Sequence, residues 1–236
     1  MNLLLLSNST NFGGGFLEWP EAHIQRFLGK SVKEVLFIPY AAVLFSGAEY
    51  SRKVAERFEA FGYKLKGIDS FDNPKVAVEQ AEAIVVGGGN TFKLLKQLYD
   101  NDLMDSLRTK IKSGTPYLGW SAGSNLACPT IMTTNDMPIV SPPSFKALGF
   151  VPFQINPHYT ERLVPNHSGE TREVRIREYL EMNPEIVVLG LSEGTLLRVD
   201  FDKINFDGKV SMKVFRRGKE DLLIEAGENI DWLLKI

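Results

Sequence analysis

The chain has 236 residues, 44% of them apolar, and its 27 lysines and arginines nearly balance its 29 aspartates and glutamates, leaving a formal net charge of −2. This balance gives no indication of a nucleic-acid or membrane partner, and no apolar run is long enough to cross a bilayer. The length fits one large α/β domain over residues 1–236. A single cysteine, Cys128, excludes an internal disulfide, and we expect a cytoplasmic protein.

Alternating strands and helices are expected along the first half of the chain. An apolar run at residues 3–6 predicts a strand buried on both faces. Ser46 and Glu49 have the spacing of a capping box at the start of the clearest helix. Further strands are expected at residues 35–38, 63–68 and 83–86, and helices at 20–28, 46–61 and 103–111. An amphipathic helix through Leu94, Leu95 and Leu98 is expected after residues 87–92. This order predicts a mostly parallel sheet with helices on both faces.

The second half of the chain is less regular and richer in proline. A helix is expected at residues 171–182, and strands at 153–156, 187–191, 196–199, 210–215 and 222–224. These strands predict completion of the sheet and a β-rich, hairpin-containing C-terminal edge within the same domain.

Residues 119–123, Gly-Trp-Ser-Ala-Gly, fit the G-x-S-x-G pattern. A short buried strand is expected before them and a helix at residues 122–128 after them, which is the setting of a nucleophile elbow. Ser121 would then lie on a sharp turn with its hydroxyl exposed. The alternative is a glycine-rich turn with a purely structural role.

A serine nucleophile needs a base, and the chain has three histidines. His23 lies inside an expected helix and His167 in a polar loop, whereas His158 follows a strand that meets a proline. Active sites of open α/β sheets form at such strand ends, which favours His158 as the base. Glu193 and Asp136 are both candidates for the acid that orients it, and either could instead bind a substrate ammonium group.

Three glycines at residues 87–89 follow a buried strand. They lack the lysine and Ser/Thr of a P-loop and the fuller dinucleotide fingerprint. As an oxyanion hole, the backbone N–H of Gly89 would act with that of Ala122, the residue after the nucleophile. The order Ser, His, Glu along the chain differs from that of α/β-hydrolases, which disfavours that fold.

Together these residues resemble the aspartyl dipeptidases of the peptidase E family. The similarity extends over much of the chain, at residues 3–10, 85–92, 119–123, 125–130, 133–140, 154–158 and 169–173. It implies a class I glutamine amidotransferase-like, flavodoxin-like fold, no metal or cofactor, and hydrolysis of dipeptides that begin with aspartate. By the same resemblance Ser121 is the nucleophile, His158 the base and Glu193 the triad acid, although Asp136 has also been regarded as a charge-relay member. The similarity is weaker at residues 11–19 and after about residue 199.

Recognition of an aspartyl side chain calls for a fixed cation, and arginine can bind a carboxylate through two hydrogen bonds. Arg172, within the matching segment 169–173, is the expected partner of that side chain, and Asp136 of the substrate ammonium group. The loop at residues 11–19 is a candidate lid over a cramped cleft. We expect a dipeptide substrate and a monomer or small homo-oligomer. The alternatives are a cyanophycinase-like hydrolase of β-aspartyl linkages and a catalytically silent binding protein of the same fold.

Overall fold

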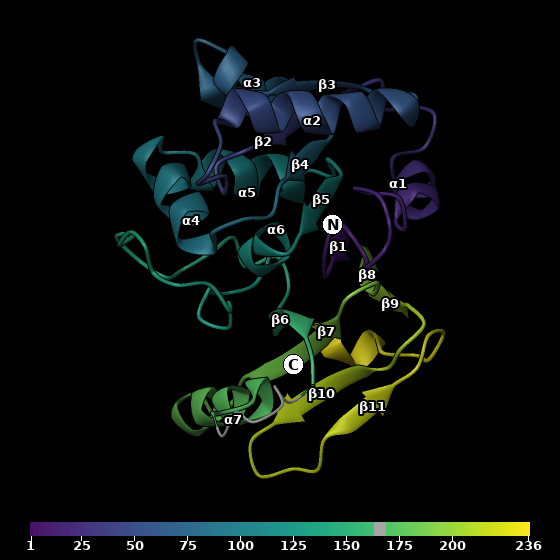
Figure 1. Ribbon diagram of the computed structural model, residues 1–236, viewed down its shortest axis with the longest axis vertical. Coiled ribbons are helices and arrows are strands. Elements are labelled where there is room, and N and C mark those ends of the chain that lie inside the picture. The colour runs from purple at the N-terminus through teal and green to yellow at the C-terminus, as the bar shows by residue number, and fades with distance from the viewer. Residues whose placement is uncertain (163–168) are drawn as a thin grey trace.

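Two β-sheets organise the chain in a computed structural model, which describes residues 1–162 and 169–236 (Figure 1). The first sheet has seven strands in the order β3-β2-β4-β5-β1-β8-β9. Its strands are β1 (Asn2–Leu6), β2 (Glu34–Ile38), β3 (Lys64–Gly67), β4 (Ile84–Val86), β5 (Tyr117–Trp120), β8 (Leu196–Asp200) and β9 (Lys203–Asp207). The second sheet, in the order β11-β10-β7-β6, contains β6 (Gln154–Tyr159), β7 (Val187–Ser192), β10 (Met212–Arg216) and β11 (Leu222–Ile224).

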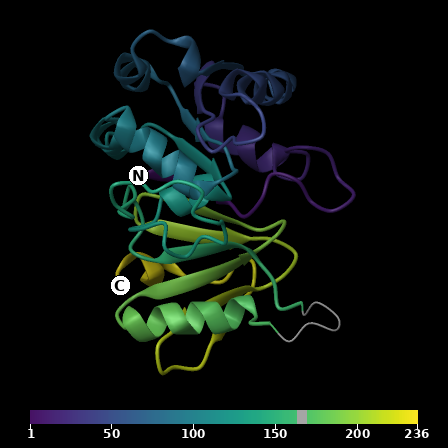
Figure 2. The same cartoon turned by 60° about the vertical axis from the view of Figure 1, so that its left-hand side comes forward.

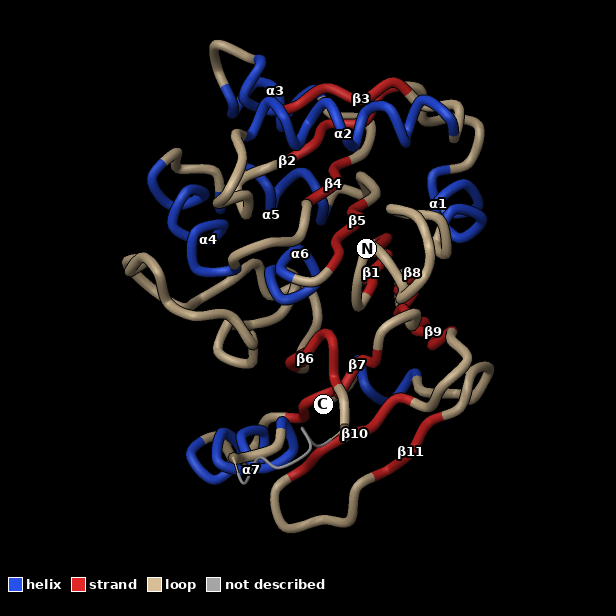
Figure 3. Tube along the Cα trace, in the orientation of Figure 1, coloured by secondary structure: helices blue, strands red, loops and turns tan. Residues whose placement is uncertain are grey.

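The five strands from β3 to β1 run parallel to one another. Their carboxyl ends therefore meet along one edge of the sheet, where the loops after β1, β4 and β5 emerge. The hairpin of β8 and β9 extends the sheet antiparallel to β1. In the tube view the parallel strands follow one another from β3 down to β1 (Figure 3).

Helices cover both faces of the first sheet, as expected for strands that are apolar on both sides. The side chains of Leu4 and Leu6 pack with α1 (Glu21–Leu28) and α2 (Gly47–Ala60). Those of Leu3 and Leu5 belong to the cluster on the opposite face. That face is covered by α3 (Pro74–Gln80), α4 (Thr91–Asp100), α5 (Met104–Lys112) and α6 (Ala122–Leu126). This arrangement confirms the predicted α/β, flavodoxin-like fold class.

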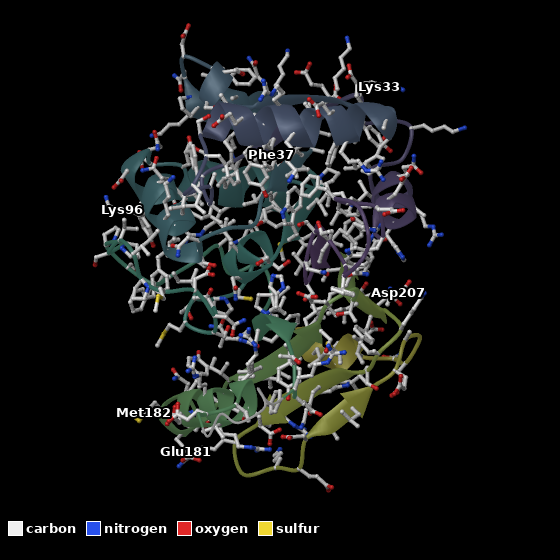
Figure 4. All side chains as sticks on the ribbon, viewed as in Figure 1. Lys33, Phe37, Lys96, Glu181, Met182 and Asp207 are labelled. Carbon is white, nitrogen blue, oxygen red and sulfur yellow. The ribbon has the colours of Figure 1, made fainter. Side chains whose placement is uncertain are left out.

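Two labelled side chains in Figure 4 illustrate these layers. Phe37, on β2, is completely buried beneath α2, where its ring packs edge-on against Tyr50. Met182, at the end of α7 (Arg172–Met182), lies on the surface.

In Figure 2 the second sheet lies between the first sheet and helix α7. Ile155, Leu189 and Val214 join the larger apolar cluster of the first sheet, so one continuous core links the two sheets. On the other face, Ile176 and Leu180 of α7 pack against strand residues of the second sheet. Strands β6 and β7 are parallel and α7 connects them, whereas β10 and β11 are antiparallel additions.

Several local features match the sequence, and some do not. The capping box of Ser46 and Glu49 forms at the start of α2. Helix α3, strand β9 and the short 3-10 helices η1 (Ile68–Ser70) and η2 (Asp231–Leu234) were not expected. Strand β6 does not break at Pro157 but continues to Tyr159, which is possible because β6 is an edge strand and the missing N–H costs no ladder bond. The single-domain assignment stays a prediction.

No helix in the described ranges has the length and apolar character needed to cross a membrane.

Candidate active site

Ser121 occupies the sharp turn between β5 and α6. Its backbone has φ 52° and ψ −111°, a conformation that non-glycine residues rarely adopt. The N–H of Ser121 donates to the carbonyl of Leu6 on β1, and its carbonyl accepts from the N–H groups of Ser124 and Asn125. The turn is therefore fixed from both sides, with the geometry expected of a nucleophile elbow.

The two glycines of the G-x-S-x-G pattern have a steric function. A Cβ on Gly119 would lie 2.5 Å from the backbone of Gly123, and a Cβ on Gly123 would lie 2.3 Å from the carbonyl oxygen of Val86. Both distances are far below van der Waals contact. The helix can begin directly behind the serine only because both positions lack a side chain.

Ser121, His158 and Glu193 form a hydrogen-bonded chain. Nε2 of His158 lies 3.0 Å from Oγ of Ser121, and Nδ1 lies 2.8 Å from Oε1 of Glu193. An ionised carboxylate only accepts hydrogen bonds, so Nδ1 carries the proton in the neutral ring. Nε2 is then free to accept the proton of the serine hydroxyl, which is the arrangement of a Ser-His-acid triad.

Irregular backbone positions both partners of Ser121. His158 is the extra residue of a β-bulge in β6 between Pro157 and Tyr159, with φ 53°. A bulge redirects a side chain that regular pairing would hold in the sheet. Glu193 lies on the tight turn from β7 into β8, before Gly194, which has φ +76°. The side chains of His158 and Glu193 remain 36% and 51% exposed, so the site is open to solvent.

Asp136, the other candidate for the orienting acid, does not contact His158. Its Oδ2 accepts hydrogen bonds from the backbone N–H and hydroxyl of Thr91 and from the hydroxyl of Thr134. The carboxylate thus holds the first turn of α4. In this geometry Glu193, and not Asp136, occupies the position beside Nδ1 of His158.

The backbone N–H groups of Gly89 and Ala122 are available for a ligand. Neither has a hydrogen-bond acceptor among the described residues. The preceding N–H, of Gly88, instead interacts with the hydroxyl of Tyr50, which also accepts from the indole of Trp120. Burial nevertheless raises the pKa of Tyr50 to about 12, so this hydroxyl remains neutral and supports the glycine loop.

Arg172, the first residue of α7, lies in a cleft beside the triad. The cleft has a volume of about 1150 Å³ and is lined by residues that include Asn11, Phe12, His158, Arg172, Glu193 and Lys213. Within residues 1–162 and 169–236 the Arg172 guanidinium forms no ion pair or hydrogen bond. Burial and the neighbouring Arg175 lower the pKa of Arg172, while the Glu193 carboxylate opposes that shift. A half-buried cation without an ion-pair partner among the described residues therefore lines this cleft.

The described part of the chain contains no group of three or more histidine, cysteine, aspartate or glutamate side chains arranged to hold a metal ion. His23 lies in α1, 3.7 Å from Asp207, on a different part of the molecule. His167 lies outside the described residues.

Comparison with known proteins identifies the family of the chain. The family model of peptidase family S51 matches residues 3–206. The chain belongs to peptidase family S51. It is 49% identical to Peptidase E of Nostoc sp. over 233 residues, which cover 99% of this chain and 96% of that relative. It is also 47% identical to Peptidase E of Salmonella typhimurium, with 96% and 99% covered.

Membership in family S51 identifies the chain as a serine-type peptidase and confirms the resemblance seen in the sequence. A solved peptidase structure from an acI-B1 actinobacterium superposes with a TM-score of 0.71 at 19% identity, covering 97% of this chain and 96% of that one. At that identity the superposition supports the fold alone.

Two polar residues beside this site were not predicted from the sequence to take part in it. Ser7 and Asn8 follow the buried leucines of β1, and both contact the segments that carry His158 and Glu193. The only local signal was their place at the carboxyl end of a buried parallel strand, where functional groups tend to gather.

Proposed function

We propose that the protein hydrolyses dipeptides with an N-terminal aspartate through an acyl-enzyme on Ser121. The observation that carries this proposal is the Arg172 guanidinium, which has no ion-pair or hydrogen-bond partner among the described residues and lines the cleft next to the Ser121–His158–Glu193 chain. A serine-type peptidase with a cation at this point is suited to a substrate whose scissile carbonyl lies next to a carboxylate side chain.

In the first step Ser121 attacks the peptide carbonyl carbon while Nε2 of His158 takes the hydroxyl proton. Glu193 accepts the Nδ1 hydrogen bond throughout, which keeps the ring in the required tautomer and stabilises the imidazolium. His158 then gives its proton to the leaving amine, and the C–N bond breaks. Water, deprotonated by His158, then attacks the ester carbon, the bond from that carbon to Oγ of Ser121 breaks, His158 returns the proton to Oγ, and free aspartate is released.

The tetrahedral intermediate carries its negative charge on the former carbonyl oxygen. In the proposal the N–H groups of Gly89 and Ala122 donate to this oxygen. One such donor typically contributes about 3 kcal/mol to transition-state stabilisation. The hydrogen bond from the Gly88 segment to buried Tyr50 would help to keep the glycine loop in its conformation.

Specificity is assigned to two charges. Arg172 would bind the aspartyl side chain through paired hydrogen bonds, and because the cation is half-buried, the interaction would be stronger than at an open surface. Asp136 would attract the substrate ammonium group, using the carboxylate oxygen that Thr91 and Thr134 leave unused. A required free ammonium group would restrict the enzyme to the N-terminal residue of short peptides.

The deciding experiment measures free aspartate released from Asp-Leu, with Leu-Leu, β-Asp-Leu and N-acetyl-Asp-Leu as comparison substrates. Cleavage of Asp-Leu alone is the expected result. Cleavage of β-Asp-Leu in its place would support a cyanophycinase-like hydrolase of β-aspartyl linkages, and cleavage of Leu-Leu at a similar rate would remove Arg172 from the proposal.

Replacement of Arg172 by alanine tests the cation directly. We expect the ratio of kcat/KM for Asp-Leu over Leu-Leu to fall by about 100-fold or more, since a buried charge partner is lost. Arg175→Ala is the matched control, because Arg175 lies on the same helix, is well exposed and forms only a long ion pair, of 3.8 Å, with Glu170. A preference that survives in Arg172→Ala would contradict the assignment.

Four further expectations stay predictions from the sequence. They are a cytoplasmic location, a monomeric or small homo-oligomeric state, activity without a cofactor, and closure of the cleft by residues 11–19.

A further inference from the structure

Three consecutive residues at the end of β1 contact the backbone of the site at three points. The carbonyl of Leu6 accepts the N–H of Ser121, at 3.1 Å. Ser7 and Asn8 follow, and their side chains are polar although the residues are only 0% and 1% exposed. Polar groups are costly to bury unless each finds a partner, so their contacts indicate what they hold in place.

Ser7 links β1 to both strands that lead to the triad partners. Its Oγ accepts the backbone N–H of His158 at 2.9 Å and donates to the carbonyl of Leu191 on β7 at 2.7 Å. The N–H of Ser7 donates to Thr195, just beyond the turn that carries Glu193. Because His158 is the extra residue of a bulge, its N–H has no ladder partner in β7, and the Ser7 hydroxyl supplies one.

Asn8 holds the turn that presents Glu193. Its Oδ1 accepts the N–H of Gly194 at 2.9 Å. Its Nδ2 donates to the carbonyl of Thr10 and to Oδ1 of Asn11, both at 2.8 Å. The amide is thereby fixed from both ends, so the oxygen that receives the Gly194 N–H cannot rotate away. Asn8 also couples this turn to the start of the loop that borders the cleft.

We propose that Ser7 and Asn8 are positioning residues that set the relative placement of Ser121, His158 and Glu193. The inference rests on the proposed function of that triad. The nucleophile belongs to the first sheet, whereas the base comes from the second sheet and the acid from the turn that leaves it. Leu6, Ser7 and Asn8 form a continuous piece of backbone that fixes all three, and a misplacement of about 1 Å at such a site can cost about 100-fold in rate.

A positioning role differs from a general contribution to stability in a double-mutant cycle. If Asn8 acts through Glu193, its removal matters only while Glu193 is present. Asn8→Ala should lower kcat for Asp-Leu by at least about tenfold with KM changed less than about twofold. In a Glu193→Ala background the same substitution should change kcat by less than about twofold.

Ser7 is tested by the rate at which a small fluorophosphonate labels Ser121. This reaction requires the His158 base but no aspartyl substrate, so it reports on Ser7 even if the wild type proves inactive on Asp-Leu and the proposed substrate is wrong. Ser7→Ala should slow labelling by at least about tenfold. Thr133→Val is the matched control: Thr133 is also buried and its hydroxyl donates to Ile155 on β6, three residues before His158, yet among the described residues it forms no hydrogen bond with Ser121, His158 or Glu193.

Thermal unfolding of each variant identifies any that do not fold. If Ser7→Ala or Asn8→Ala does not fold, Ser7→Cys or Asn8→Asp replaces it. Both replacements keep the side-chain size and weaken or alter the same hydrogen bonds. Equal losses of kcat with and without Glu193, an effect on KM alone, or slowing by Thr133→Val as large as that by Ser7→Ala would overturn the proposal. Losses confined to the Glu193-containing background and to the Ser7 variant would support it.

Discussion

The two sheets hold their shares of the site by different physical means. In the first sheet, Ser121 is fixed by packing, since β5, α6 and β4 approach so closely that Gly119 and Gly123 cannot carry a Cβ. In the second, His158 and Glu193 lie on a bulge and a turn that are partly exposed and held by hydrogen bonds. The difference suggests that the nucleophile cannot move without disturbing the core, whereas the base and the acid can be displaced while the fold persists.

Removal of the nucleophile is expected to have the largest effect. Ser121→Ala should reduce kcat/KM for Asp-Leu by about 10⁴-fold or more, because only the oxyanion donors and substrate binding remain. The melting temperature should stay within about 2 °C, since Oγ is not part of the core packing. The measurement is aspartate release combined with calorimetry. Substantial residual activity in a folded Ser121→Ala protein would exclude Ser121 as the nucleophile.

The two acids are expected to differ in which kinetic constant they affect. Glu193→Ala should lower kcat by about 100-fold or more and leave KM nearly unchanged, because the imidazolium loses its partner only in the transition state. Asp136→Asn should raise KM by about tenfold or more with little change in kcat, since it removes a charge from substrate binding. Asparagine keeps an oxygen that can accept the Thr91 N–H, which preserves the start of α4.

Steady-state kinetics on Asp-Leu would separate these two effects. The reverse pattern, with kcat lowered in Asp136→Asn and KM raised in Glu193→Ala, would mean that the roles of the two carboxylates are exchanged.

The two regions also differ in how much of their geometry the sequence predicts, because one is held by local packing and the other by contacts between distant segments. The elbow around Ser121 depends on a strand, two glycines and a helix within about a dozen consecutive residues, so its geometry follows from local pattern. The choice between Glu193 and Asp136 depends on contacts between distant parts of the chain. His158 and Glu193 are 35 residues apart in the sequence, and Thr91 and Asp136 are 45 residues apart. Residue types alone did not separate them, and the family resemblance favoured Glu193.

The second sheet and the role of Ser7 and Asn8 were beyond the sequence for a related reason. A β-strand, a helix and a parallel strand produce the same pattern whether they extend an existing sheet or begin a new one, so β6 and β7 could not be distinguished from further strands of the first sheet. Ser7 and Asn8 look like ordinary polar residues at a strand end. Their burial arises from segments more than 140 residues away, which only the folded chain brings to them.

The tight packing at the elbow predicts a large loss of stability on a small substitution. Gly123→Ala should lower the free energy of unfolding by about 3 kcal/mol, because the new methyl group collides with the Val86 carbonyl of β4 and the backbone has to move. Gly218→Ala is the control. It lies at φ +65° with open space around a Cβ, so only the backbone conformation is strained, at a cost of about 1 kcal/mol.

Urea unfolding of both glycine variants measures the difference. If the two lose equal stability, the elbow is not held by steric packing, and the contrast drawn between the two sheets is wrong for the first of them.

A substitution at Lys213, on the second sheet, should have a smaller effect on stability, and that effect should depend on pH. Lys213 is only 16% exposed and lies 2.8 Å from Glu161 and 2.9 Å from Glu173. Burial opposes its charge, but hydrogen bonds to both carboxylates outweigh this and raise the pKa of Lys213 above its usual 10.5. The same contact, followed by one from Arg177, lowers the pKa of Glu173 below its usual 4.5.

A lowered carboxylate pKa contributes stability above pH 4.5 that disappears as the pH falls through the folded-state value. The raised pKa of Lys213 contributes stability below pH 10.5 that is lost as the pH rises through its higher folded-state value. Lys213→Met should therefore cost about 1 kcal/mol at pH 7 and progressively less below pH 4.5, whereas Lys219→Met, at an exposed turn, should cost almost nothing at any pH. Thermal unfolding from pH 3 to pH 7 measures both variants. A loss in Lys213→Met that is independent of pH would show that this lysine acts by packing, and the second sheet would then resemble the first.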